Sequence, residues 1–312
     1  MCRVNNLCQS LYIRFLISTA ATFNFLNPQK GCQPRIAGFY ILPGCFVSTY
    51  STFTKMMSPG KEYYSSHSKL PFIAEKGQEQ LLQSKVLVVG AGGLGCPCLL
   101  ALTGAGIGTL GIADFDAVSV SNLHRQHLYS LEDEGKKKTA VAKERLSKYN
   151  PFIHLQTHDV LVYEKTVLPL LEGYDVIVDC TDNFLARYLI NDACVYLNKP
   201  LVYGAIHRAE GHVTVFNYHG SGTLRCLFPK DESDSTQSCA DIGAYNIVTG
   251  MVGLMMANEV IKIITDHEEV LAGRLLTMDV LTGNTMKLQY ALENGSLLKS
   301  RERFGTSINN SQ

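Results

Sequence analysis

Short apolar runs alternate with longer amphipathic segments between residues 75 and 217. Each run has the length and the β-branched, aliphatic composition of a strand that is buried on both faces of a parallel sheet. The expected strands are residues 86–89, 109–113, 153–156, 176–179 and 201–205, and helices are expected at 75–82, 96–105, 135–150 and 183–197. This alternation predicts an α/β fold with a doubly wound, Rossmann-like sheet.

The pattern changes after the last of these strands. The expected elements are a strand at 212–217, a polar loop from 221 to about 238, a buried helix at 246–265 and a hairpin of two strands at 274–279 and 285–290. The sheet is therefore expected to be mixed, with a C-terminal antiparallel extension. The polar end of the chain after Glu293 is expected to fray.

A glycine-rich stretch directly follows the first expected strand. Gly90, Gly92 and Gly95 fit the pattern G-x-G-x-x-G, with Gly93 inside it. Missing side chains let the chain turn tightly and let a phosphate group reach backbone N–H groups. Asp114 follows the second expected strand 24 residues after Gly90, near the spacing at which an acid accepts ribose hydroxyls. This order favours a nucleotide-binding unit over a turn without function, although the glycines alone would also permit an NAD- or FAD-dependent oxidoreductase.

Residues 1–57 differ from the rest of the chain. Six Lys and Arg residues precede Glu62, the first acidic residue, and no long helical or strand period is present. A mitochondrial-type transit peptide, a secretory signal and a translation start at Met56 or Met57 all fit this stretch, and we favour the late start. The expected units are a leader at 1–57 that is disordered or not translated, a nucleotide-binding adenylation domain at 58–290 and a polar tail at 291–312.

Composition argues against some classes of protein. The chain carries 28 Lys and Arg against 28 Asp and Glu, and because six bases precede the first acid, the rest is mildly acidic. Nucleic-acid binding is therefore not favoured. The ten cysteines include no C-x-x-C pair, which is typical of a reducing compartment and favours a cytoplasmic protein. The apolar patch at 15–25 is too short to span a bilayer, so no membrane association is expected.

Five short motifs occur in order along the domain. They are G-A-G-G-L-G at 90–95, D-F-D at 114–116, S-N-L-H-R-Q at 121–126, C-T-D-N at 180–183 and R-C-L-F-P at 225–229. In their order and spacing, the chain resembles the ThiF/MoeB/HesA family of adenylating enzymes, relatives of the ubiquitin-activating enzymes, from about residue 62 to residue 290.

The resemblance implies a substrate, two cofactors and several partners. Such enzymes use ATP and Mg²⁺ to adenylylate the C-terminal glycine of a small β-grasp sulfur-carrier protein, of the ThiS or MoaD type, that ends in Gly-Gly. Pyrophosphate is released, and the product serves sulfur transfer for thiamine or molybdopterin. The resemblance also implies a homodimer, and a sulfurtransferase or a cysteine desulfurase as a further partner.

The resemblance assigns contacts with the ATP phosphates to Arg125 and Lys138. A carboxylate that approaches a polyphosphate needs positive charge near both reactants, and these two side chains would supply it. Without the resemblance, Lys138 would be taken as part of a solvated run that starts at Lys136. Because its spacing from Ser121 matches the family, we interpret Lys138 as catalytic.

Asp182 follows an expected strand at the carboxyl edge of the sheet, where ligands bind in open α/β folds. The resemblance gives it a catalytic role in holding Mg²⁺, a hard cation that prefers carboxylate and phosphate oxygens. As an alternative, Asp182 caps the helix that starts at Asn183. Further nucleotide contacts are assigned to Gly90, Gly92, Gly93, Gly95, Asp114, Asp116, Ser121, Asn122, Gln126 and Asn183. For Asp116, the alternative is that it caps the loop.

Cys239 is the candidate nucleophile. It lies in S-C-A-D-I-G, where some members of the family carry a cysteine that forms a thioester or an acyl persulfide with the carrier. A thiolate near a helix N-terminus has a lowered pKa and attacks acyl-adenylates readily. Cysteine in an α/β protein is more often a buried small hydrophobe, so both interpretations stay open.

Two departures from the family pattern change the expectations. Thr223 stands where many relatives have the first cysteine of a zinc site, which leaves Cys226 alone, so no zinc is predicted. Ser66 stands where relatives have an arginine that reaches the ATP of the partner subunit, and Lys69 is the nearest cation. The alternatives are therefore a catalytically weakened member that acts as a carrier-protein or nucleotide binding module, and a tRNA-modifying dehydratase of the same superfamily.

Overall fold

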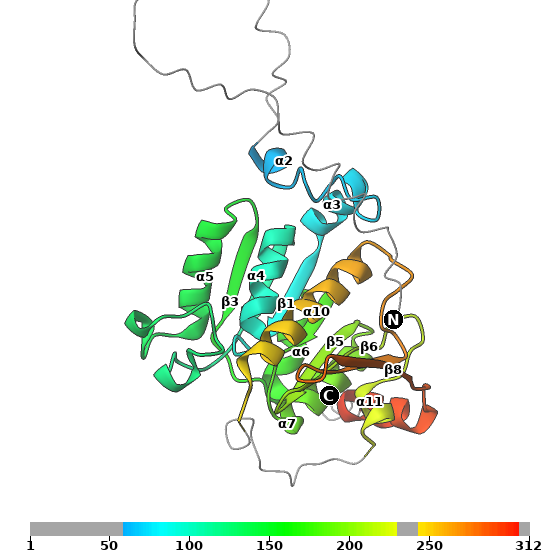
Figure 1. Cartoon of the computed structure of the whole chain (residues 1–312). Coiled ribbons are helices and arrows are strands. Elements are labelled where there is room, and N and C mark those ends of the chain that lie inside the picture. Colours follow the sequence, from blue (N-terminus) through cyan, green and yellow to red (C-terminus); the bar gives the residue numbers. More distant parts are fainter. Residues whose placement is uncertain (1–58, 230–242, 306–312) are drawn as a thin grey trace, which may run out of the picture. The chain divides into compact units, whose positions relative to one another are not determined.

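A central sheet of eight strands organises the part of the chain that the structure, a computed structural model, describes: residues 59–229 and 243–305 (Figure 1). The strand order is β3-β2-β1-β4-β5-β6-β7-β8. The strands are β1 (Lys85–Val89), β2 (Thr109–Ala113), β3 (His154–His158), β4 (Val176–Asp179), β5 (Leu201–His207), β6 (Glu210–Phe216), β7 (Arg274–Asp279) and β8 (Asn284–Gln289).

The sheet has a parallel half and an antiparallel half. All neighbours from β3 to β5 are parallel, whereas β5, β6, β7 and β8 pair antiparallel. This arrangement confirms the predicted doubly wound, mixed sheet with a C-terminal antiparallel extension. The order of the strands reverses between β1 and β4, and open α/β sheets bind ligands at such a switch point.

Two layers of helices cover the sheet (Figure 1). The helices are α2 (Pro59–Tyr63), α3 (Ala74–Gln83), α4 (Gly95–Ala105), α5 (Lys138–Tyr149), α6 (Glu164–Glu172), α7 (Phe184–Tyr196), α8 (Leu224–Leu227), α10 (Asn246–Ile264) and α11 (Asn294–Gly305), with 3₁₀ turns η1 (Val120–Asn122) and η2 (Leu131–Asp133). Val86 and Val88 of β1 share one core with α4, α5 and α10, whereas Leu87 and Val89 share the other with α6 and α7. Alternate residues of this strand therefore pack into opposite cores, which is why its sequence is apolar from Val86 to Val89.

Helix α10 is the predicted buried helix, and it begins and ends within one residue of the expected bounds. By length and composition alone it could cross a membrane, but half of its most apolar window is buried inside the protein. It packs on α4, β5 and β6. A Cβ on its Gly253 would come within 2.4 Å of the Leu94 carbonyl oxygen, so this position requires glycine, whereas a Cβ on Gly250 would meet nothing within 4 Å.

Four helices of the described residues, α2, α6, α8 and α11, were not predicted from the sequence. Helix α6 has only nine residues and contains Pro169, and a proline inside a helix removes a backbone hydrogen bond and argues against a helix in the sequence. The expectation that the chain frays after Glu293 is wrong, because Asn294–Gly305 forms α11. The buried face of α11 is made of two serines and Phe304, whose ring lies 5.9 Å from that of Tyr196. Small polar residues at helical spacing gave no hydrophobic signal in the sequence. The expected polar loop after residue 221 likewise contains α8.

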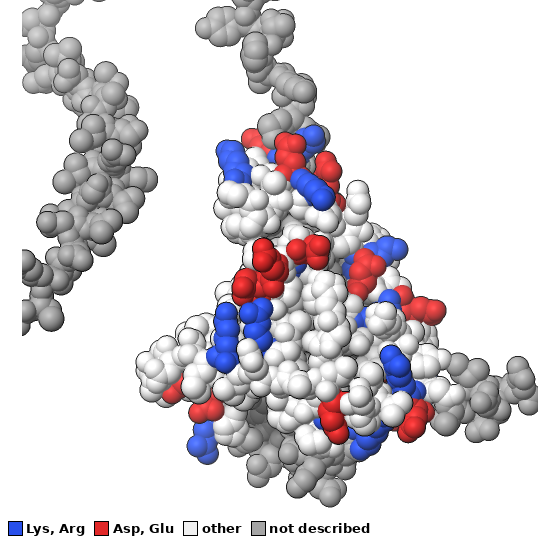
Figure 2. All heavy atoms as spheres, turned by 90° about the vertical axis from the view of Figure 1, so that its right-hand side faces the viewer, with Lys and Arg blue, Asp and Glu red and all other residues white. Residues whose placement is uncertain are grey.

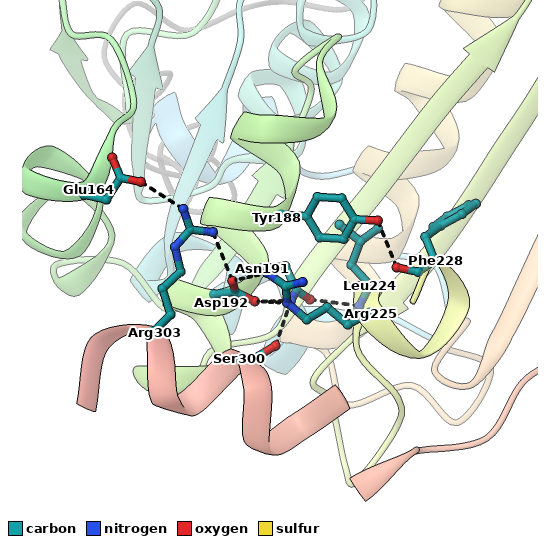
Figure 3. Close-up of polar contacts among 9 residues, drawn as sticks. All are labelled: Glu164, Tyr188, Asn191, Asp192, Leu224, Arg225, Phe228, Ser300 and Arg303. Carbon is teal, nitrogen blue, oxygen red and sulfur yellow. Dashed lines mark hydrogen bonds and ion pairs between the residues drawn. The ribbon is translucent and has the colours of Figure 1, made fainter. Parts of the chain in front are cut away.

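A buried carboxylate joins α7, α8 and α11 (Figure 3). Asp192 of α7 accepts two hydrogen bonds from Arg225, at 2.8 Å to Nε and 2.7 Å to Nη2. Arg303 of α11 lies 3.3 Å from the same carboxylate and 2.9 Å from Glu164 of α6. Tyr188 of α7 donates to the Phe228 carbonyl at 2.9 Å. The R-C-L-F-P motif is therefore part of the structural attachment of α11 to α7.

Replacing Arg303 with methionine is expected to lower the free energy of unfolding by about 1 kcal/mol, because its ion pairs with the buried Asp192 and the exposed Glu164 are lost while Asp192 keeps Arg225. Urea denaturation of the full chain measures this. The matched control is Arg301→Met on the exposed side of the same helix, which is expected to leave the urea midpoint unchanged. Equal midpoints for both variants would show that these ion pairs do not hold α11.

The antiparallel end of the sheet is open to solvent. All six residues of the outer strand β8 are exposed. Figure 2 shows the side of the molecule that lies to the right in Figure 1, where acidic and basic side chains are interspersed instead of forming a field of one sign.

Candidate active site

A cavity of about 270 Å³ lies at the carboxyl ends of β1, β2 and β4. Its walls come from the glycine loop after β1, from Asp114 to Asp116 after β2 and from Cys180 to Asn183 after β4. The cavity therefore lies at the switch point of the sheet, where the topology predicts a ligand.

At two positions of the glycine loop, other backbone atoms lie so close that no side chain would fit. Gly90 has a φ of +96°, and a Cβ on it would lie 2.7 Å from the Cys180 carbonyl oxygen. A Cβ on Gly95 would lie 1.9 Å from the Gly90 carbonyl oxygen. Gly90, Gly92 and Gly93 line the cavity, whereas Gly95 begins α4 and does not line it. Gly95 therefore serves the turn and not the ligand directly.

Asp114 is held in place by backbone amides. Its Oδ2 accepts from Ala91 N at 2.7 Å, and its Oδ1 accepts from Asp116 N at 2.8 Å. Burial raises the pKa of Asp114, and the positive charge of Lys138 partly offsets this rise. Each carboxylate oxygen has a second lone pair, so Asp114 can still accept a ribose hydroxyl.

Lys138 is the first residue of α5 and is only 4% exposed. Its Nζ lies 2.7 Å from Asp116 Oδ2 inside the cavity. Its neighbours Lys136 and Lys137 are exposed and pair with Asp133 and with an acid after β3. The interpretation of Lys138 as part of a solvated run is therefore wrong, and Asp116 is its partner and not a loop cap.

Arg125 follows η1 and lies beside the glycine loop. Its Nη2 donates to Asn122 Oδ1 at 2.6 Å, and its Nη1 donates to His124 Nε2 at 2.8 Å. Gln126 lies beside Gly92, and its Oε1 is buried without a hydrogen-bond partner among the described residues. A buried acceptor without a partner is costly, so Gln126 is suited to contact a ligand.

Asp182 and Asn183 line the cavity at the start of α7. The helix cap is Asn183, whose Oδ1 accepts from Ala186 N at 2.9 Å, so the alternative of Asp182 as the cap is wrong. The exposed carboxylate of Asp182 has no hydrogen bond to another described residue. Within residues 59–229 and 243–305, no three His, Cys, Asp or Glu side chains form a metal cluster. A magnesium ion here would use one or two carboxylates and the phosphates of its substrate, as Mg²⁺ commonly does.

Four helices begin at this cavity. Residues at or just before the first turns of α4, α5, α7 and α10 all line it. Free backbone N–H groups make a helix N-terminus attractive to anions. Together with Lys138 and Arg125, this arrangement favours a polyanionic ligand such as a nucleoside triphosphate.

The ThiF family matches residues 64–297, three quarters of the chain. The chain belongs to the ThiF family. The chain is 46% identical over 227 residues to the adenylyltransferase and sulfurtransferase MOCS3 of Anopheles gambiae, a match that covers 72% of this chain and 52% of that protein. It is 43% identical over 231 residues to the sulfur carrier protein adenylyltransferase of Thermus thermophilus, which covers 72% of this chain and 85% of that protein. This ThiF-family chain spans about half the length of its MOCS3 relatives.

Solved structures share the fold of this ThiF-family chain. E. coli MccB in complex with MccA-N7isoASN superposes with a TM-score of 0.66 at 22% identity, over 76% of this chain and 73% of that one. E. coli MccB with ATP superposes with a TM-score of 0.63 at 24% identity, over 70% of this chain and 67% of that one.

Some expected site residues of this ThiF-family chain are not at the cavity. Ser121 is exposed, and its hydroxyl lies 3.1 Å from that of Ser119, so it does not line the cavity. Ser66 is exposed in the turn after α2, outside the cavity. Cys239 lies outside the described residues. Cys226 accepts a hydrogen bond from the Thr223 amide at 3.3 Å, and the absence of zinc stays a prediction.

Sequence reasoning missed part of the wall. Arg187 of α7 lines the cavity and is only 6% exposed. Its Nη2 donates to the Thr181 carbonyl at 2.8 Å, and its Nη1 donates to Tyr203 Oη at 3.1 Å. Arg187 lies in the first turn of a helix that starts at a ligand site, and this position could have indicated its place in the cavity wall. Residues 160–162 form an apolar wall, and no pattern marks this irregular segment.

Proposed function

We propose that this chain adenylylates the C-terminal glycine of a small sulfur-carrier protein with ATP and releases pyrophosphate. The observation that carries the proposal is the convergence of Arg125, Lys138 and Asp182 on one cavity beside the glycine loop. Both relatives named above are adenylyltransferases, and one is named for a sulfur carrier protein. The ThiS or MoaD type of carrier is the part of the proposal that rests on the resemblance alone.

The cavity suits this reaction chemically. A carboxylate oxygen of the carrier forms a bond to the α-phosphorus of ATP, and the bond from that phosphorus to the bridging oxygen of pyrophosphate breaks. Both reactants are anions, so fixed positive charge that strengthens as the charge develops lowers the barrier. Lys138 and Arg125 provide this charge, and Asp114 orients the ribose.

The carboxylates at the cavity suit a magnesium ion. Asp182 is available, and Asp116 becomes available when Lys138 turns to a phosphate. When bound, Mg²⁺ neutralises charge on the phosphate oxygens of the substrate and the leaving pyrophosphate.

The proposal includes a homodimer. Ile247, Met251 and Leu254 are exposed apolar residues that recur along one face of α10, which is the pattern of a helix that meets a partner. A monomeric mass in light scattering of the full chain would contradict this part. A sulfurtransferase or a cysteine desulfurase as a further partner rests on the resemblance.

The test is ATP–pyrophosphate exchange with purified candidate carriers that end in Gly-Gly. Exchange is expected with one of these carriers and is expected to vanish when its terminal glycine is removed, because the carboxylate then falls short of the α-phosphate. Binding of a carrier and of ATP without exchange would instead favour the binding module, for which Ser66 is the supporting observation. Activity on tRNA without exchange would favour the dehydratase.

A further inference from the structure

The carbonyl of Ala91, in the middle of the glycine loop, receives two hydrogen bonds from side chains outside the loop. Tyr129 Oη donates to it at 2.9 Å, and Cys96 Sγ donates at 3.4 Å. Both side chains are almost completely buried. Burial raises the pKa of Tyr129 and raises that of Cys96 to about 12, so both groups stay protonated and can donate.

These two bonds fix the direction of the next amide. The Ala91–Gly92 peptide is trans, so its N–H points opposite to its carbonyl. Gly92 lines the cavity whereas Ala91 is fully buried, and no described residue accepts from the Gly92 amide. The Ala91 N–H is itself held by Asp114. The Ala91–Gly92 peptide is therefore held on both sides, and the Gly92 N–H, like those of Gly93 and Leu94, has no acceptor among the described residues.

Tyr129 is itself rigidly placed. The segment from Arg125 to Tyr129 runs beside the glycine loop, with Arg125 next to Gly93 and Gln126 next to Gly92. Arg145 of α5 donates to both neighbours of Tyr129, the Leu128 carbonyl and the Ser130 hydroxyl. Arg125 and the glycine loop, which both line the cavity, are thus connected through this tyrosine.

We propose that Tyr129 is a positioning residue, whose hydroxyl fixes the Ala91–Gly92 peptide so that the Gly92 amide donates to a nucleotide phosphate. This inference deepens the proposed function, because it rests on a nucleotide in the same cavity. It concerns binding of the phosphates and not the chemical step or the carrier.

The test compares two ligands in isothermal titration calorimetry of the full chain, ATP with Mg²⁺ and adenosine. Tyr129→Phe keeps the ring and removes the hydroxyl. The Kd for ATP is expected to rise ~3- to 10-fold, as for the loss of one hydrogen bond, while the Kd for adenosine stays the same. Cys96→Ala is also expected to raise the Kd for ATP, but by less, because a thiol is a weaker hydrogen-bond donor than a hydroxyl.

The matched control is Tyr174→Phe, which removes another buried hydroxyl, bonded to His158 and Gln156. It is expected to leave both affinities unchanged. If Tyr129 had a purely structural role, its replacement would weaken the binding of adenosine as much as the binding of ATP. That result, or an unchanged Kd for ATP, would overturn the inference. If the selective loss is seen but no carrier supports exchange, the proposed function fails while the role of Tyr129 stands. A wild-type chain that binds no ATP would overturn both.

Discussion

Replacing Lys138 with methionine is expected to reduce carrier-dependent ATP–pyrophosphate exchange by ~10²- to 10³-fold. The methionine side chain has nearly the same length and fills the same buried space, but it removes the positive charge at the first residue of α5. That charge lies inside the cavity, held at 2.7 Å from Asp116, so it needs no rearrangement of solvent to meet a phosphate. The loss is expected mainly in the rate at saturating ATP, because charge develops as pyrophosphate leaves.

The control for Lys138 is its neighbour. Lys137→Met removes the same charge from a side chain that is about half exposed and pairs with Asp159 at 3.1 Å. Exchange is expected to change less than threefold, in line with the small worth of an exposed ion pair. If Lys137→Met and Lys138→Met lose the same activity, the effect comes from net charge near the pocket, and the role given to Lys138 is wrong.

Asp182→Asn is expected to lower exchange by ~10²-fold, because an amide is a poor ligand for a hard cation and the charge of the metal is worth several kcal/mol in such a reaction. The variant should also need more Mg²⁺ for half-maximal exchange. A magnesium titration of exchange at fixed ATP measures both effects. Folding is expected to be unaffected, since the exposed Asp182 does not cap α7.

Asp175→Asn provides the comparison for Asp182. It lies just before the same strand, at the opposite edge of the sheet, where its Oδ2 accepts from Lys85 N at 2.8 Å. It is expected to keep the activity and the magnesium requirement of the natural chain. Full exchange by Asp182→Asn at ordinary magnesium concentration would remove the metal role from this residue.

The inner strands of the parallel half were predictable because both of their faces are buried, whereas in the edge strand β3 only Leu155 is buried. Strands β2 and β4 begin and end where the apolar runs do, at Thr109–Ala113 and Val176–Asp179. Helix α11 was not predictable in this way. Its attachment depends on Arg225 and Asp192, which come from distant parts of the sequence, and a hydrophobic period carries no information on such polar contacts.

The candidate site was predictable to the extent that its residues follow strands. Asp114 and Asp182 were assigned correctly to the carboxyl edge because the ends of parallel strands meet there. The burial of Lys138 was not visible in a run of three lysines, since it depends on Asp116 reaching it from the loop after β2. Arg187 was missed because its position depends on how α7 packs against the Tyr203 ring.

Helix α7 carries Asn183 at the cavity and Asp192 at the attachment of α11, about 14 Å further along the same helix. A shortened variant that stops before Asn294 would therefore remove the contacts that α11 makes with α7. Such a variant, made to improve expression or crystallisation, should be judged by nucleotide affinity as well as by yield. A protein fused after Gly305 would act on the same contacts between α11 and α7.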